Sequence, residues 1–208
     1  MLATRMRMGG PAPKVLAFET SVGSSANAST YTFTAVDVGP AAADRRNIIA
    51  AHAQNGTAGI TNVTVGGDAW TEIQDAFNVS CVMGLGIVLN PVGTAEDIVV
   101  TFAASHTSAS IGVWSSTGLN TDTPVDSGFS TATAPTDTLT TVAGGFAIGA
   151  ITNQLGGPVS WAGVTERYDA LVDTHVQSAG DAVTDGTNLT ITATITGASR
   201  QVGVFASF

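Results

Sequence analysis

Residues 189–196 read LTITATIT and alternate strictly between apolar and hydroxyl-bearing side chains. Successive side chains of a β-strand point to opposite faces, so this period of two predicts a strand with one buried face. No stretch of the chain carries the 3.6-residue apolar stripe of an amphipathic helix. The composition agrees, because Thr and Val favour strands and strong helix formers other than Ala are few. The chain is therefore expected to be all-β.

The chain also contains a short repeated motif, which we call the echo. Residues 71–77 read TEIQDAF and residues 165–171 read TERYDAL, and the segments around them match in the same order. Loops tolerate small deletions, which explains why the spacing between matches shortens along the chain. We interpret this as a diverged duplication with copies at 14–117 and 122–208. The matched flanks are NIIAAHAQN with GFAIGAITN, DIVVTF with NLTITA, and IGVW with VGVF.

Each copy has few large core residues, and no long linker separates the two. These features favour one antiparallel, jelly-roll-like β-sandwich of about 12–14 strands, with the copies related by a pseudo-two-fold axis. Two tandem immunoglobulin-like sandwiches are the alternative.

The charge balance limits the partners. The formal net charge is −9, the pI is about 4.4 and only 11% of residues are charged. Nucleic-acid and anionic membrane surfaces select clusters of Lys and Arg, so neither is an expected partner. The single cysteine, Cys81, lies in an apolar stretch and is expected to be a buried, inert thiol.

Residues 1–13 are expected to form an arm rather than part of the sandwich. Gly9, Gly10 and two prolines interrupt regular structure there, and no apolar run of signal-peptide length is present. Arg5 and Arg7 make the arm basic in an acidic chain, and Lys14 follows it directly. These three cations are the predicted partner-binding residues, either as a strap on an acidic neighbour or as a solvated tail.

The sequence offers few candidates for catalytic or metal-binding residues. His52, His106 and His175 have no second ligand at metal-binding spacing, and no nucleophile elbow is present, so no cofactor, metal or catalytic residue is predicted. The acidic residues of the echo would serve a glycosidase only if they faced each other across a cleft. Loops at 120–126 and 181–188 are oxygen-rich but lack an EF-hand pattern. The acidic positions of the echo are Glu72, Asp75, Glu166 and Asp169.

Three aromatic residues leave carbohydrate binding as an alternative function. Trp70, Trp161 and Tyr168 would form a sugar-stacking platform if they were exposed together. Core packing is the plainer interpretation of each ring.

Residues 111–128, IGVWSSTGLNTDTPVDSG, follow IVVTFAASHTSAS, and residues 63–72 read VTVGGDAWTE. This pattern resembles phage-encoded β-sandwich virion proteins over about half of the chain. The resemblance implies a structural setting rather than a catalytic activity.

The sequence therefore predicts a non-enzymatic bacteriophage virion protein. The leading form is a capsid decoration or cement protein that stabilises the head, with a tail accessory protein as the nearest variant. Expected partners are the major capsid protein or other virion proteins, and further copies of the chain, on the virion surface. A carbohydrate-binding or adhesin module on a virion or cell surface is the alternative.

Overall fold

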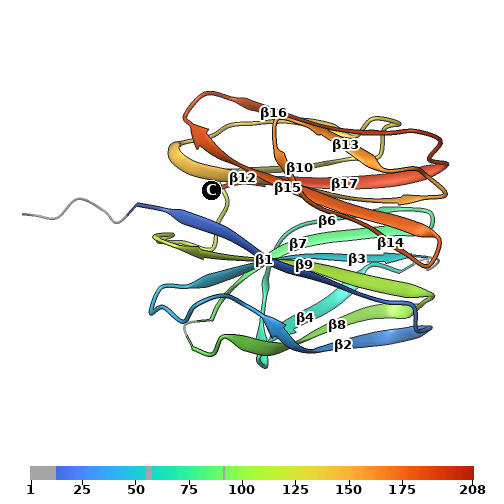
Figure 1. Cartoon of the computed structure of the whole chain (residues 1–208), viewed down its shortest axis with the longest axis horizontal. Coiled ribbons are helices and arrows are strands. Elements are labelled where there is room, and N and C mark those ends of the chain that lie inside the picture. The colour runs from blue at the N-terminus through green and yellow to red at the C-terminus, as the bar shows by residue number, and fades with distance from the viewer. Residues whose placement is uncertain (1–12, 55–57, 91) are drawn as a thin grey trace, which may run out of the picture.

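The computed structural model describes residues 13–54, 58–90 and 92–208 (Figure 1). These residues form 17 β-strands and no helix, in antiparallel sheets. The all-β sandwich class predicted from the sequence is confirmed. The number of strands exceeds the expected 12–14.

The strands fall into two consecutive sets. The first set is β1 (Val15–Ser24), β2 (Ala28–Asp37), β3 (Arg46–Gln54), β4 (Ile60–Val65), β5 (Asp68–Ala69), β6 (Thr71–Asn78), β7 (Cys81–Leu89), β8 (Ala95–His106) and β9 (Ser108–Thr117). The second set is β10 (Asp126–Ser130), β11 (Thr136–Leu139), β12 (Ala143–Gln154), β13 (Val159–Ala162), β14 (Thr165–Val172), β15 (His175–Asp185), β16 (Leu189–Ile195) and β17 (Arg200–Ser207).

Both sets use one strand order. The five-stranded sheets run β1-β9-β3-β7-β6 and β10-β17-β12-β15-β14, and the smaller sheets run β2-β8-β4-β5 and β11-β16-β13. In each set the first strand pairs with the last and the second with the last but one. This nested pairing is compatible with the jelly-roll-like arrangement, which stays a prediction.

The sheets stack in four layers (Figure 1). The two five-stranded sheets are the inner layers and face each other across a shared core, while each smaller sheet covers the outer face of one of them. Each half of the chain therefore forms a sandwich, and the two sandwiches pack face to face. This differs from the single sandwich of 12–14 strands that the sequence favoured.

The physical reason for the four layers is that the chain has two kinds of strand. Strands buried on both faces carry nearly continuous apolar runs, whereas strands with one solvated face alternate. Strand β7, CVMGLGIVL, is buried along almost its whole length and lies in an inner sheet. Strand β16, LTITATI, alternates between buried and accessible positions and lies in an outer sheet.

The echo occupies equivalent edge strands. TEIQDAF lies on β6 and TERYDAL on β14, and each is the last strand of its five-stranded sheet. In both strands the register shifts at the third residue of the motif, Ile73 or Arg167. A bulge of this kind bends an edge strand and increases its twist. The repeated motif therefore corresponds to a bulged edge strand in each half.

Candidate functional site

We call the contact between the two five-stranded sheets the seam. Its apolar part draws large side chains from both halves, including Leu85, Ile87 and Trp114 from the first and Phe146 and Ile148 from the second. All five are essentially inaccessible to solvent. Burying apolar area of this extent stabilises the contact strongly, so the seam joins the halves as a domain core would.

Asp181 is the central polar residue of the seam. Its Oδ2 accepts hydrogen bonds from Trp114 Nε1 in the first half and from Arg167 Nε, both at 2.8 Å, and its Oδ1 accepts one from Arg167 Nη2 at 2.8 Å. The carboxylate is almost fully buried, whereas the guanidinium is partly exposed. The hydrogen bond to Asp181 is the main reason that the pKa of Arg167 is raised. The bidentate pair thus fixes Arg167 over the seam.

A second cross-half contact joins His52 and Tyr168. The Tyr168 hydroxyl lies 2.7 Å from His52 Nε2, and both side chains are buried. Burial lowers the pKa of His52 to about 3, because the charged imidazolium would lose its hydration. The Tyr168 ring also lies against Gly112 and beside Phe18 and Trp114. Tyr168 is therefore inserted from the second half into the first.

Gly112 is what admits the Tyr168 ring. A Cβ atom at Gly112 would lie 2.5 Å from the Tyr168 hydroxyl oxygen. Replacing Gly112 by valine is expected to displace the ring, break its contact with His52 and lower the free energy of unfolding by about 2 kcal/mol. Chemical denaturation measures this change. Gly59→Ala is the matched control, because a Cβ there meets only Asp75 Oδ2 at 3.6 Å. Equal effects of the two substitutions would contradict this role of Gly112.

The seam becomes polar toward the end of β3. Gln54 Nε2 donates to Asp173 Oδ2 at 2.6 Å, and Ser80 Oγ donates to Gln154 Oε1 at 2.9 Å, so both contacts link the halves. Several buried polar atoms here have no hydrogen-bond partner among the described protein atoms. They are His52 Nδ1, Gln54 Oε1, Ser108 Oγ, Thr152 Oγ1, His175 Nε2 and the side-chain amide atoms of Gln177.

His175 belongs to this polar end. Burial lowers the pKa of His175 to about 4, against a smaller opposing effect of the Asp173 charge. The histidine is therefore neutral in the folded protein at physiological pH. The sequence placed no functional weight on His52 or His175, because nothing in their local sequence reveals that sheet packing brings them into one interface.

The predicted basic residues are only partly within the described chain. Arg5 and Arg7 lie outside the described residues. Lys14 is half-buried and borders a hollow of about 460 Å³ between the halves. The side chains and backbone around this hollow belong to Pro13, Lys14, Gly118, Asn120, Ala143, Gly144 and Val183. The arm therefore meets the body at one end of the contact between the halves.

The three aromatic candidates lie in three different layers. Trp70 packs against the core between the first inner sheet and its cover, and Tyr168 lies in the seam. Trp161 packs between the second inner sheet and its cover, where its Nε1 donates to Ser178 Oγ at 2.8 Å. Trp70 and Trp161 are half-buried and Tyr168 is buried. The three rings therefore belong to three different packing clusters.

The acidic residues of the echo lie on the two edge strands. Burial raises the pKa of Glu72 and of Glu166, with a smaller contribution from Asp75 and Asp169 respectively. Asp169 Oδ2 accepts a hydrogen bond from the Val159 backbone N–H at 3.0 Å. The repeat thus places one Glu and one Asp near each other in each half.

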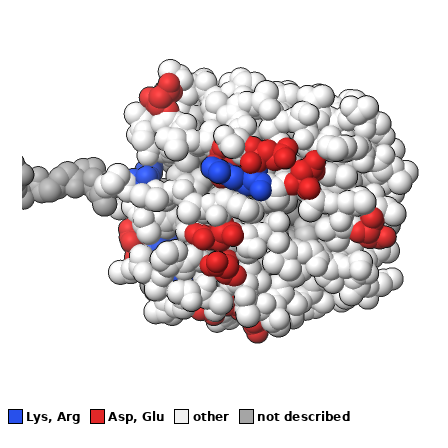
Figure 2. Space-filling model, viewed as in Figure 1, with Lys and Arg blue, Asp and Glu red and all other residues white. Residues whose placement is uncertain are grey.

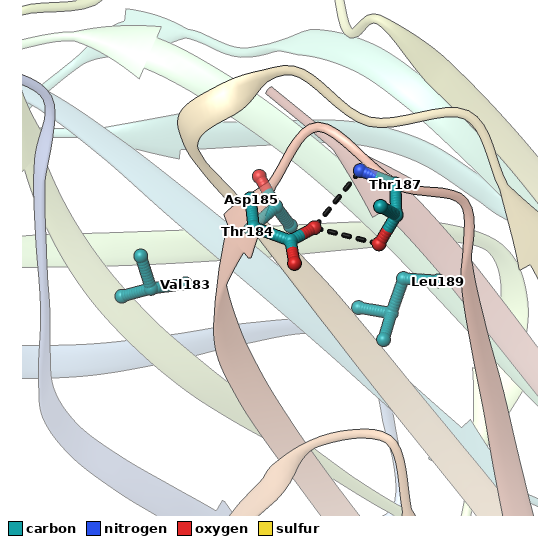
Figure 3. Close-up of a pocket in the computed structure, with 5 residues that line it drawn as sticks. All are labelled: Val183, Thr184, Asp185, Thr187 and Leu189. Atoms are coloured by element: carbon teal, nitrogen blue, oxygen red, sulfur yellow. Dashed lines mark hydrogen bonds between the residues drawn. The ribbon is translucent and has the colours of Figure 1, made fainter.

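The oxygen-rich loops use their side chains for local contacts. Figure 3 shows Asp185 beside a hollow of about 260 Å³, where its Oδ1 accepts hydrogen bonds from the Thr187 N–H at 2.9 Å and hydroxyl at 2.6 Å. In the inter-half loop Asp122 pairs with Arg46 at 2.6 Å, and at the start of β10 Asp126 accepts from the Thr140 N–H. Within the described ranges no cluster of three or more His, Cys, Asp or Glu is arranged to hold a metal ion.

Cys81 is buried in the seam, with its Sγ 3.6 Å from the Arg200 carbonyl oxygen. Burial raises the pKa of the thiol to about 12, so it is protonated at physiological pH. The part of the chain that the structure describes includes no helix that could span a bilayer. On the face in Figure 2, acidic side chains are scattered over a largely uncharged surface, with a few basic ones among them.

Comparisons with known proteins found little. No family model and no curated protein matches the chain. One solved structure, of PBSX exported protein XepA, is similar at 13% identity over 93% of this chain and 86% of that chain, with a TM-score of 0.24. At that score the similarity carries no argument about fold or function.

Proposed function

We propose that the chain is a bacteriophage virion structural protein without catalytic activity. Its most concrete form is a decoration or cement protein on the outside of the head, and a tail accessory protein is the nearest variant. The proposal draws its setting from the resemblance of residues 63–72 and 98–128 to phage β-sandwich virion proteins.

The observation that carries the proposal is the seam. An apolar core and cross-half hydrogen bonds from Asp181, His52, Gln54 and Ser80 join two sandwiches into one block. A protein that reinforces a particle must transmit load between contact points without unfolding, and a body with a continuous buried core does so. The buried and half-buried aromatic rings give the carbohydrate-binding alternative no comparable support.

The arm supplies the docking element in this proposal. Residues 1–12 contain Arg5 and Arg7 and no acidic residue, so the rest of the chain carries a formal charge of −11, that is −9 less 2. Opposite charge steers a basic segment toward an acidic partner surface. We assign that surface to the major capsid protein or another virion protein, together with neighbouring copies of the chain.

The test uses particles of the phage that encodes the chain. Mass spectrometry of purified particles is expected to detect the protein, and immunogold labelling is expected to mark the head surface. Labelling of the tail would select the accessory variant. Intact particles that lack the protein would overturn the proposal.

Arm-dependent binding is tested separately. Removing residues 1–13, or replacing Arg5 and Arg7 by glutamate, is expected to reduce co-sedimentation with particles at least tenfold while the circular dichroism spectrum is unchanged. Arg200→Glu is the matched charge control on the exposed body surface. Normal particle binding by the truncated chain would exclude the arm as the docking element.

A further inference from the structure

Strand β14 is an open sheet edge. Within the described residues it pairs with β15 on one side and with no strand on the other. An edge of this kind presents unpaired backbone N–H and C=O groups to an incoming strand. The equivalent strand in the first half, β6, is also the last of its sheet.

An apolar groove lies beside this edge. It has a volume of about 270 Å³ and is bordered by Gly156, Gly157, Pro158, Asp169, Leu171 and Val176. Leu171 is 71% exposed, and Leu155, the residue before Gly156, is 67% exposed. Leu155 also has a φ of 57°, which strains a residue with a branched side chain. An exposed leucine in the groove and a second one next to its border in sequence mark a candidate contact surface.

Strand β14 and the turn after it carry three acidic residues, of which Asp169 borders the groove and Asp173 also accepts the hydrogen bond from Gln54. Glu166 and Asp169 lie on β14, and Asp173 follows it in the turn to β15. The guanidinium of Arg167, the cation on this strand, is paired with Asp181. An incoming segment that suits this edge therefore combines apolar side chains with positive charge.

Residues 1–8, MLATRMRM, have this composition. Leu2, Thr4, Met6 and Met8 occupy even positions. Arg5 and Arg7 occupy odd positions. In an extended strand the first group would form an apolar face and the second a basic face. Methionine is also suited to filling an irregular groove, because its side chain is unbranched and flexible.

Met6 and Met8 of the same chain lie too close to Pro13 in sequence to reach the groove. A Cβ at Gly23, near the end of β1, would lie 2.7 Å from Val172, which places that end of β1 beside Leu171. Pro13 lies at the other end of β1, about 30 Å away at strand rise. Met8 is five residues before Pro13, and five residues span at most about 17 Å. Seven residues, from Met6 to Pro13, span at most about 25 Å, so Met6 and Met8 in this groove must come from another molecule.

We propose that residues 1–8 of a second copy of this chain add as a strand to the open edge of β14, with Met6 and Met8 in the groove beside Leu171. The inference rests on the proposed function insofar as the arm is the docking element. It extends that function by assigning the arm a partner surface on a neighbouring copy.

The test measures self-association of the full chain without phage particles, by sedimentation velocity over a range of concentrations. The unmodified chain is expected to associate. Leu171→Asp in the body and the double replacement Met6→Asp/Met8→Asp in the arm are each expected to raise the dissociation constant at least tenfold. Phe77→Asp is the matched control, because Phe77 is the equivalent residue of the echo on β6 and is 44% exposed.

Mixing the arm variant with the groove variant tests whether the arm of one copy binds the groove of another. A nonspecific effect of the substitutions on the surface would not be reversed by mixing. The arm variant keeps an intact groove and the groove variant keeps an intact arm, so an equimolar mixture is expected to associate through one intact contact. Thermal unfolding of each variant confirms that it is folded, and Leu171→Ser replaces Leu171→Asp if the latter is not.

A monomeric unmodified chain, no association in the mixture, or a loss with Phe77→Asp equal to that with Leu171→Asp would each overturn the inference. These results are independent of the proposed function. If the chain is absent from virions, it can still associate through the arm and the groove in this assay. If it is a virion protein that binds only through other surfaces, it does not associate in this way.

Discussion

Replacing Arg45 by methionine is expected to lower the free energy of unfolding by about 3–5 kcal/mol, because four buried or part-buried carbonyl groups would lose their donor. The guanidinium is fully buried and donates to the carbonyl oxygens of Gly39, Asn90, Val92 and Gly93 at 2.5–2.8 Å. Burial lowers the pKa of Arg45, an effect that nearby carboxylates oppose. Urea denaturation followed by tryptophan fluorescence measures the loss.

Two further substitutions test the geometry. Arg45→Lys keeps the charge but not the planar arrangement of donors, so it is expected to cost about 2–3 kcal/mol. Arg200→Met removes an exposed guanidinium that makes only long hydrogen bonds, 3.5 Å to Ser80 Oγ and to Gln154 Oε1, so it is expected to change stability by less than about 0.5 kcal/mol. If Arg45→Met is as mild as Arg200→Met, the buried guanidinium does not organise these loops.

Acidification from pH 7 to pH 5 is expected to lower the free energy of unfolding by about 2 kcal/mol for each of His52 and His175. Their folded pKa values, about 3 and about 4, lie below the ordinary value of 6.5. The unfolded chain therefore takes up protons near pH 6.5 that the folded chain does not. Stability is complete above that pH and falls progressively as the pH approaches the folded values.

The groups around these histidines set the size of the effect. His52 faces the Tyr168 hydroxyl from β14 and the backbone of Ile151 from β12, whereas His175 lies near Asp173. Carboxyl groups whose pKa is raised act in the opposite direction, because they favour the folded state as the pH falls. The groups concerned are Glu72, Glu166 and Asp169. Their effect is reduced by solvent screening.

Denaturant titrations between pH 8 and pH 4 measure this dependence. His52→Gln is expected to remove about 2 kcal/mol of the loss between pH 7 and pH 5, because one of the three buried histidines is removed. His106→Gln is the comparison outside the seam: burial lowers the pKa of His106 too, but its hydrogen bonds with the Gln54 and Ala58 carbonyl oxygens oppose that shift, so a smaller effect is expected. A pH dependence that is the same with and without His52 would exclude this histidine as a source of acid sensitivity.

Much of the fold was accessible from the sequence because strand periodicity is local. The alternation of residues 189–196 identified a half-buried strand, which is β16 in an outer sheet. The echo identified two segments that occupy equivalent edge strands with a bulge at the same position. The number of layers was not accessible, since a continuous apolar run shows that both faces of a strand are buried but not which sheet covers each face.

The candidate site was harder to predict from the sequence. Asp181 was considered only as an oxygen donor of a loop, whereas it links Arg167 to Trp114 across the seam. One signal was present: the echo has Ile73 in the first copy and Arg167 in the second, so a charge replaces an apolar residue at a bulge. The partner of that charge is separated in sequence and could not be identified from spacing.

By itself the sequence determined the strand class, the repeated order of segments and the acidic, disulfide-free character of the chain, because these depend on residue type and on neighbours a few positions away. Tertiary structure alone decided that two sandwiches stack into four layers and that His52 meets Tyr168. It also decided that Gly156 and Leu171 border one groove. Those contacts join residues far apart in the chain, and only the packing of sheet faces brings them together.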